Sequence, residues 1–162
     1  MKKKTESGRS MIEMVGVLAV MGLITAGAFV LISSGLQSQK RSSVTDEIDV
    51  IAANVRSLGA QATDRTTPYT TLPANCAGTG TGVADAKSLA EALLGSSVSA
   101  YGTGTYYSVC QTDNAAHFAV ALNGLTKSEC KTLAARAYSN GTAVCTPGTA
   151  NNNSYVTVTF KQ

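Results

Sequence analysis

The sequence predicts an α+β protein in which one long N-terminal helix, apolar in its first half, packs its second half on a C-terminal globular domain with an antiparallel sheet. Three observations predict this fold. They are a stretch without ionisable side chains from Met14 to Gln39, an apolar stripe at helical spacing directly after it, and segments of alternating apolar residues near the C-terminus. The 162 residues suffice for one domain with a sizeable core.

Composition and charge exclude several functional classes. Hydrophobic residues make up 44% of the chain and charged residues 14%, well below the roughly 25% charged residues of a typical soluble domain. The apolar fraction excludes a disordered chain, and a scattered net charge of +3 gives no reason to expect nucleic acid as a partner. A single histidine excludes a catalytic or metal-binding histidine pair.

No motif in the chain predicts catalysis, a cofactor or a metal. The run Gly78–Gly82 lacks the spacing of a phosphate-binding loop, and we expect a surface loop there. His117 stands at the start of a predicted strand, where a structural or surface role is expected. No nucleophile elbow and no CxxC pair occur. The sequence therefore predicts no enzyme, no catalytic residue, no cofactor and no metal site.

The apolar segment is long enough to cross a membrane. The 26 residues from Met14 to Gln39 would rise about 39 Å as a helix, more than the roughly 30 Å of a bilayer's hydrocarbon core. The basic residues before it predict a cytoplasmic N-terminus, which leaves the rest of the chain outside. These residues are Lys2, Lys3, Lys4 and Arg9.

A cleaved signal peptide is the ordinary alternative, because Ala26-Gly27-Ala28 offers a small-residue cleavage site. The apolar run continues past this site to Ile32, which disfavours that alternative. Glu13 disfavours it as well. A carboxylate inside a bilayer costs about 2.5–3.5 kcal/mol, so a partner for Glu13 is expected.

A second stretch of the same helix is predicted to be amphipathic. Apolar residues recur at steps of three and four, and charged residues fall off this stripe. The stripe consists of Val44, Ile48, Ile51, Val55, Leu58 and Ala62. We expect residues 40–64 to continue the membrane helix, and the two prolines in Thr66–Pro73 to break it.

The remaining residues, 65–162, are predicted to form the globular head. Two helices are expected: one over Asp85–Leu94, capped by Asp85 and stopped by Gly95, and one that opens with the capping box Thr126–Glu129 and ends at Asn140-Gly141. A turn-rich segment is expected from Thr142 to Ser154. Strands are expected over residues 105–110, 117–122 and 155–160.

The four cysteines are Cys76, Cys110, Cys130 and Cys145. An even number of cysteines spread over a compact domain favours two disulfides and an oxidising compartment. Four reduced, buried thiols in a cytosolic protein are the alternative. Three pairings are open at this point.

The start of the chain resembles a known motif. Gly8-Arg9-Ser10-Met11-Ile12-Glu13 followed by an apolar helix resembles the prepilin motif of type IV pilins and of type II secretion pseudopilins. The resemblance implies that a membrane peptidase removes residues 1–8, cutting between Gly8 and Arg9, and that the new N-terminus is methylated. It further implies that residues 9–39 are the membrane and assembly helix, with Glu13 as the family's fifth-residue glutamate.

The C-terminal half is similar to type IVb pilins, the toxin-coregulated and bundle-forming kind. The similar segments are Phe118-Ala119-Val120, Asn123–Thr126 and Cys130–Leu133. In those pilins a cysteine on this helix bonds a cysteine ahead of the last strand. The resemblance thus implies a Cys130–Cys145 disulfide, which leaves Cys76 for Cys110. Together the two resemblances span about residues 8–60 and 116–160.

These resemblances imply the pilin fold and a structural role. The chain would be a subunit of an extracellular type IV pilus, held in the inner membrane before assembly. Its partners would be other copies of the chain, the prepilin peptidase, the membrane, and the pilus assembly machinery of the inner membrane, with roles such as adhesion or secretion. A secretion pseudopilin or minor pilin is the near alternative, and a membrane-tethered periplasmic enzyme or binding domain the distant one.

Overall fold

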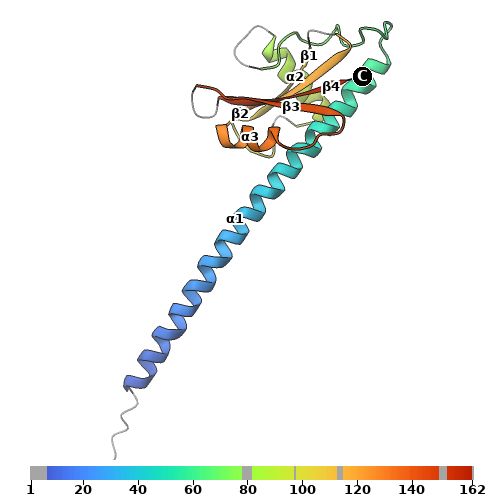
Figure 1. The fold of residues 1–162 in the computed structure, drawn as a ribbon. Coiled ribbons are helices and arrows are strands. Elements are labelled where there is room, and N and C mark those ends of the chain that lie inside the picture. The colour runs from blue at the N-terminus through green and yellow to red at the C-terminus, as the bar shows by residue number, and fades with distance from the viewer. Residues whose placement is uncertain (1–6, 78–81, 97, 113–114, 150–152, 162) are drawn as a thin grey trace, which may run out of the picture. The chain divides into compact units, whose positions relative to one another are not determined.

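The computed structural model describes residues 7–77, 82–96, 98–112, 115–149 and 153–161 (Figure 1). Its helices are α1 (Ser7–Ala60), α2 (Val83–Leu94) and α3 (Lys127–Ala134), and its strands are β1 (Tyr106–Gln111), β2 (His117–Leu125), β3 (Gly141–Thr146) and β4 (Ser154–Lys161). The chain forms two compact units, Met1–Gln39 and Lys40–Gln162. The predicted α+β architecture, a long N-terminal apolar helix followed by an antiparallel sheet domain, is confirmed.

The first unit contains the N-terminal part of α1. Every side chain from Met11 to Gln39 is exposed, although most of them are apolar. The exposure reaches 78% at Ile12 and 76% at Leu23. The glycines of this stretch have open space where a side chain would lie. Within its own unit, this part of the helix is therefore bare on all sides.

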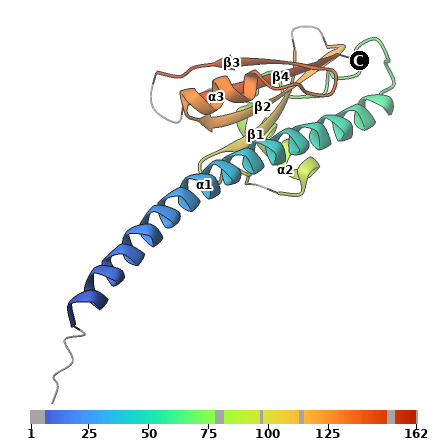
Figure 2. The same ribbon diagram turned by 60° about the horizontal axis from the view of Figure 1, so that its bottom comes forward.

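The second unit is built on a four-stranded antiparallel sheet in the order β1-β2-β4-β3 (Figure 2). One face of β2 carries Phe118, Val120 and Leu122, and all three side chains are fully buried. Phe118 stacks on Phe160 of β4 with ring centroids 5.2 Å apart. This apolar face forms one wall of the main core.

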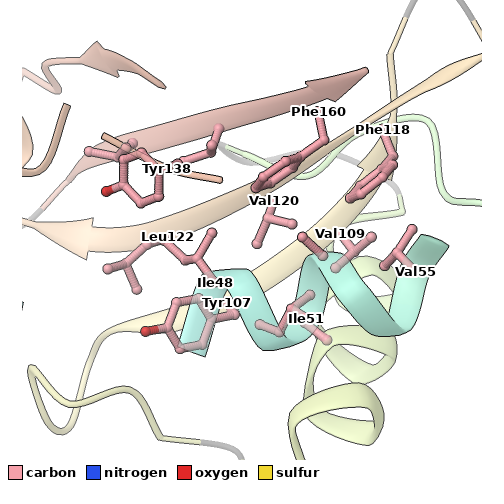
Figure 3. Close-up of a cluster of buried hydrophobic side chains, with 14 of the residues drawn as sticks. Ile48, Ile51, Val55, Tyr107, Val109, Phe118, Val120, Leu122, Tyr138 and Phe160 are labelled. Carbon is pink, nitrogen blue, oxygen red and sulfur yellow. The ribbon is translucent and has the colours of Figure 1, made fainter. Parts of the chain in front are cut away.

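The other wall of the main core is the C-terminal part of α1 (Figure 3). Val44, Ile48, Ile51 and Val55 of the predicted stripe are fully buried. Leu58 is an exception because it is 44% exposed, and the last predicted stripe residue follows the end of the helix. The amphipathic prediction is thus right over about three turns and wrong at the last one.

Polar residues beside the stripe fasten α1 to other elements. The Asn54 side-chain amide donates to the carbonyl of Leu93 at the end of α2, with an N–O distance of 2.8 Å. The Ser139 hydroxyl donates to the Asp49 carboxylate at 3.0 Å. Helix α1 is therefore held by directional bonds on both flanks of its buried stripe.

Helix α1 ends at Ala60, before the prolines that were expected to break it. The amide of Gln61 donates to the carbonyl of Leu58 at 3.1 Å, which tightens the last turn. Gly59 lies against the ring of Tyr69, and a Cβ there would come within 2.9 Å of the ring carbon Cζ. Gly59 thus lets the last turn of α1 lie close to the Tyr69 ring, and residues 61–64 of the predicted helix lie outside the helix.

A smaller core covers the opposite face of the sheet near β1. It consists of Cys76, Ala86, Cys110, Ala119 and Ala121, and all five side chains are buried. Small side chains on this face let the loop after α1 approach the strands closely. The loop also bonds the edge of the sheet, because the amide of Gln111 donates to the carbonyl of Pro73 at 2.9 Å.

Two predicted helix limits are wrong. Helix α2 begins at Val83, after Gly82 in the left-handed region with φ 97°, so Asp85 is a first-turn residue and not the cap. Gly95 does end this helix, as predicted. Helix α3 opens with the predicted capping box at Thr126 but ends at Ala134, well before Asn140. Most of the predicted loop Gly78–Gly82 lies outside the described residues.

The predicted turn-rich segment after Asn140 in fact contains strand β3. The turn that precedes it explains the sequence Asn140-Gly141. Asn140 has φ 62°, a left-handed conformation that asparagine tolerates, and a Cβ on Gly141 would meet Val158 at 2.6 Å. The predicted strand 117–122 is also too short, since β2 continues through a register shift to Leu125.

Candidate assembly site

The exposed apolar stretch of α1 carries one ionisable group between Met11 and Gln39, namely Glu13. Glu13 borders a shallow hollow on the helix surface, where Gly16 has no side chain. The hollow is otherwise lined by Val17, Val20, Met21 and Ile24. A carboxylate beside an apolar notch is a surface that a complementary apolar helix with a cationic group would cover.

The hydroxyl groups in this stretch do not make it polar. The hydroxyls of Thr25, Ser33 and Ser34 donate to the carbonyls of Met21, Val30 and Leu31, at 2.7, 2.9 and 3.0 Å. Hydroxyls bonded in this way are compatible with an apolar environment. In length and composition this helix is able to cross a membrane.

The predicted cleavage residues Gly8 and Arg9 have helical backbone at the start of α1. Most of the predicted leader, residues 1–6, lies outside the described residues. Cleavage between Gly8 and Arg9 therefore stays a prediction.

The cysteines form two disulfides, Cys76–Cys110 and Cys130–Cys145, with Cα–Cα distances of 5.1 and 5.4 Å. These are the pairs expected from the resemblance to type IVb pilins. The first bond ties the loop after α1 to β1, and the second ties α3 to β3. Each disulfide thus fastens a peripheral segment to the sheet.

A buried polar network beside the first disulfide was not predicted. The side-chain amide of Asn123 donates to the Cys76 carbonyl at 3.2 Å and to the Ser108 hydroxyl at 2.9 Å. The Ser108 hydroxyl also donates to the Cys76 carbonyl. The only sign of this network in the sequence is that Ser108 and Asn123 are polar residues within otherwise apolar strands.

A second unpredicted contact joins α1 to the sheet. The hydroxyl of Tyr107 donates to the carboxylate of Glu47, with an O–O distance of 2.5 Å. Burial, and then the hydrogen bond to Glu47, raise the pKa of Tyr107 far above its ordinary value of 10.0. Tyr107 is 4% exposed and belongs to the main core. Tyr106 lies under the ammonium of Lys87, 5.2 Å from the ring centroid.

A pocket of about 480 Å³ with polar and apolar lining lies at the end of α1. Asp64 lies on its rim, but its carboxylate accepts hydrogen bonds from the Thr66 amide and from the hydroxyls of Thr66 and Thr67. These bonds lower the pKa of Asp64 to about 2. The carboxylate is thus already occupied by its own loop. Across the described residues, no three metal-ligating side chains are grouped closely enough to hold an ion.

Comparisons with protein-family profiles, with curated proteins and with solved structures found no match. Geometry and sequence pattern must therefore carry the functional argument.

Proposed function

We propose that this chain is the structural subunit of a type IV pilus, processed by a prepilin peptidase and polymerised through its N-terminal helix. The observation that carries the proposal is the stretch from Met11 to Gln39, which is helical, mostly apolar and exposed along its whole length. The second unit already has a closed core, so it does not need this stretch in order to fold. A surface of this kind requires lipid around it before assembly and copies of itself afterwards.

Burial of apolar surface would drive the assembly. Once the helix leaves the bilayer, each Å² of its apolar surface that helix packing keeps out of water contributes about 25 cal/mol. Glycines at 16, 22, 27 and 35 have open space around them, so neighbouring helices can approach closely there. Removal of the helix from the lipid is thus compensated by helix–helix packing in the centre of the filament.

Glu13 would select the register of each incoming subunit. Cleavage after Gly8 creates a new cation, the α-amine of Arg9, at the end of the apolar helix. A Glu13 carboxylate that meets this amine on a neighbouring subunit is neutralised, whereas an unpaired buried charge costs several kcal/mol. A filament would then grow only when the incoming subunit binds in a register that pairs these two groups.

The disulfide-bonded second unit would coat the outside of the filament. Both disulfides close peripheral segments on the sheet, which suits a domain exposed to an oxidising exterior. In this proposal the chain first lies in the inner membrane with its N-terminus in the cytoplasm. The assembly machinery then moves it into an extracellular pilus.

The mature N-terminus tests the proposal. Intact-mass measurement of the membrane-extracted protein should give a chain that begins at Arg9. A Gly8→Leu variant should retain the leader, while the matched Ser7→Leu variant should lose it. A wild-type chain that begins at Phe29 would indicate a signal peptide, and an uncut chain would favour a tethered enzyme or binding domain. A Gly8→Leu protein that begins at Arg9 would show the cleavage assignment to be wrong.

A further inference from the structure

The two edges of the sheet in the second unit differ. Strand β1 forms one edge, where the Gln111 amide donates to the Pro73 carbonyl of the loop after α1 at 2.9 Å and residues 107–110 are buried. Strand β3 forms the other edge. Within the residues that the structure describes, the backbone of Thr142–Thr146 pairs with β4 alone. The outer side of β3 therefore presents backbone donors and acceptors that another strand can bind.

Strand β3 lacks the features that usually protect the edge of a sheet. Its sequence, Gly-Thr-Ala-Val-Cys-Thr, contains no charged residue and no proline. All six of its residues pair with β4 in one unbroken register, so no bulge twists the edge away. Natural proteins use charges, prolines and bulges at edge strands to prevent pairing with another chain. The edge formed by β3 is thus open to such pairing.

The side chains of β3 indicate what kind of strand fits beside it. Thr142, Val144 and Thr146 are exposed and share one face of the strand, whereas Ala143 and Cys145 pack against the main core on the other. Val144 is 57% exposed, more than any other large apolar side chain in the described part of the second unit. An uncharged strand with β-branched side chains is therefore the partner that matches this edge.

A second copy of β3 meets this requirement. In an antiparallel pair, residues directly opposite each other lie on the same face of the sheet. A two-fold pair centred on Val144 puts Val144 opposite Val144 of the second copy, and Thr142 opposite Thr146, so that β-branched side chains pair with each other. On the other face it puts Ala143 opposite Cys145, and both are small. Because β3 carries no charge, the two-fold axis brings no like charges together within the pair.

We propose that two copies of the chain associate through β3, edge to edge and antiparallel, with Val144 on the two-fold axis. The proposal goes beyond the proposed function and does not depend on it, because it concerns the second unit alone. The contact would join the sheets of the two copies into one continuous sheet. Successive subunits of a helical filament are related by a screw rotation and not by a two-fold axis. The contact would therefore join copies that are not neighbours in the same filament.

Cysteine crosslinking of the full chain in detergent tests the proposal. The native cysteines are all bonded, so an introduced cysteine supplies the one free thiol. Val144→Cys should give a disulfide-linked dimer under mild oxidation, because opposite residues of an antiparallel pair have Cα atoms about 4.5–5.5 Å apart. Thr142→Cys is the matched control. In the proposed register its two copies are offset by about 14 Å along the strands, so its dimer yield should be about tenfold lower.

A mixture of two variants provides a second crosslink. Thr142→Cys mixed with Thr146→Cys should give mixed dimers, because these two positions lie opposite each other in the proposed register. Thr146→Cys alone should give as little dimer as Thr142→Cys alone. Non-reducing peptide mapping identifies the bonded pair and verifies that both native disulfides are retained.

Two results of the crosslinking would overturn the proposal. The first is a Val144→Cys dimer yield no higher than that of Thr142→Cys, which would indicate random collision or association through the apolar part of α1. The second is preferential bonding between Val144→Cys and Thr142→Cys, which would indicate a different register. Neither result affects the mature N-terminus, so a failure here is distinguishable from a failure of the proposed function.

A charge variant provides an independent measurement. Amide hydrogen exchange of residues 141–146 should slow about threefold as the protein concentration rises, because the outer amides of β3 gain partners. Val144→Lys puts two ammonium groups opposite each other on the axis, so its exchange should not depend on concentration. The control Val98→Lys alters an exposed valine outside the strands and should keep the wild-type dependence. A Val144→Lys protein that keeps this dependence would overturn the proposal.

Discussion

The two parts of α1 share one backbone but differ in what surrounds them. From Val44 to Val55 the apolar side chains occupy one stripe, and that stripe is fully buried against the sheet. From Met11 to Leu36 apolar side chains occupy the whole circumference, and all of them are exposed. The stripe is covered by the sheet of the same chain. The apolar surface from Met11 to Leu36 is not covered within its own unit, so it needs lipid or another apolar surface around it.

For the proposed pilus subunit, this difference would separate folding from assembly. Substitutions in the buried stripe should change the free energy of unfolding of the second unit. Substitutions in the bare stretch should leave that free energy unchanged and act on filament formation.

The largest effect is expected from Glu13→Ala. Without this carboxylate, an incoming subunit has no partner for the α-amine of Arg9, so few or no filaments should form. Cleavage and membrane insertion should remain normal. Electron microscopy and the yield of sheared filaments measure the effect in cells that carry the assembly machinery. Asp46→Ala, which removes an exposed carboxylate from the other part of α1, is the control and should assemble normally. Wild-type filament yield from Glu13→Ala would refute the pairing mechanism.

Ile51→Ala should have the largest effect on folding. Ile51 is fully buried in the main core, so its truncation should cost about 2–5 kcal/mol of unfolding free energy. The neighbouring Val50 is 49% exposed, and Val50→Ala should change stability by less than about 0.5 kcal/mol. Urea denaturation of the full chain in detergent measures both. Equal losses in the two variants would mean that the buried stripe is assigned to the wrong face.

Removal of the disulfides should have the next largest effect. The Cys76–Cys110 bond spans 34 residues, and the Cys76→Ser, Cys110→Ser variant should lose about 4 kcal/mol in the chain-entropy model. The Cys130–Cys145 bond spans 15 residues, and its removal should cost about 3 kcal/mol. Non-reducing peptide mapping verifies the pairs. A peptide that links Cys110 to Cys130 would contradict both assignments.

Tyr107→Phe should have a smaller, pH-dependent effect. Loss of the hydroxyl that donates to Glu47 should cost about 1.5–3 kcal/mol at neutral pH. The pKa of Tyr107 is raised by burial and by Glu47, so its contribution is complete below pH 10 and declines as the pH rises further. Above pH 10 the advantage of wild type over Tyr107→Phe should therefore shrink by about 1.4 kcal/mol per pH unit. Urea titrations on either side of pH 10 measure it. If the difference in unfolding free energy between wild type and Tyr107→Phe stayed constant across pH 10, the pKa of Tyr107 would not be raised in the folded protein.

The sequence was a good guide wherever a strong local pattern existed. The stripe at Val44 and Ile48, the capping box at Thr126 and the alternation in β4 each follow from the spacing of residue types, and the structure has all three. Strand β3 was missed because its inward residues, Ala143 and Cys145, are small, while Val144 faces outward and is 57% exposed. The sequence of β3 therefore does not show which of its two faces is apolar.

Contacts between distant segments were beyond local patterns. The hydrogen bonds that Asn123 and Ser108 donate to the Cys76 carbonyl depend on where the backbone of the loop meets the sheet. The pair Glu47–Tyr107 depends in the same way on how α1 crosses β1. The contact of Gly59, near the end of α1, with the ring of Tyr69 depends likewise on a residue ten positions further on. No periodicity in the sequence encodes these three contacts.

The central claim, that the bare stretch of α1 is covered by other copies of the chain, is tested most directly by photo-crosslinking within filaments. A photoreactive phenylalanine replaces Leu23, which is 76% exposed, or in a second variant Val50 in the folded unit. Irradiated filaments of the Leu23 variant should yield crosslinked dimers and longer ladders that join α1 to α1, as mapped by mass spectrometry. The Val50 variant should not crosslink to the stretch from Met11 to Gln39 of a neighbouring copy. A Leu23 variant that assembles but crosslinks only to lipid or to unrelated proteins would contradict the account.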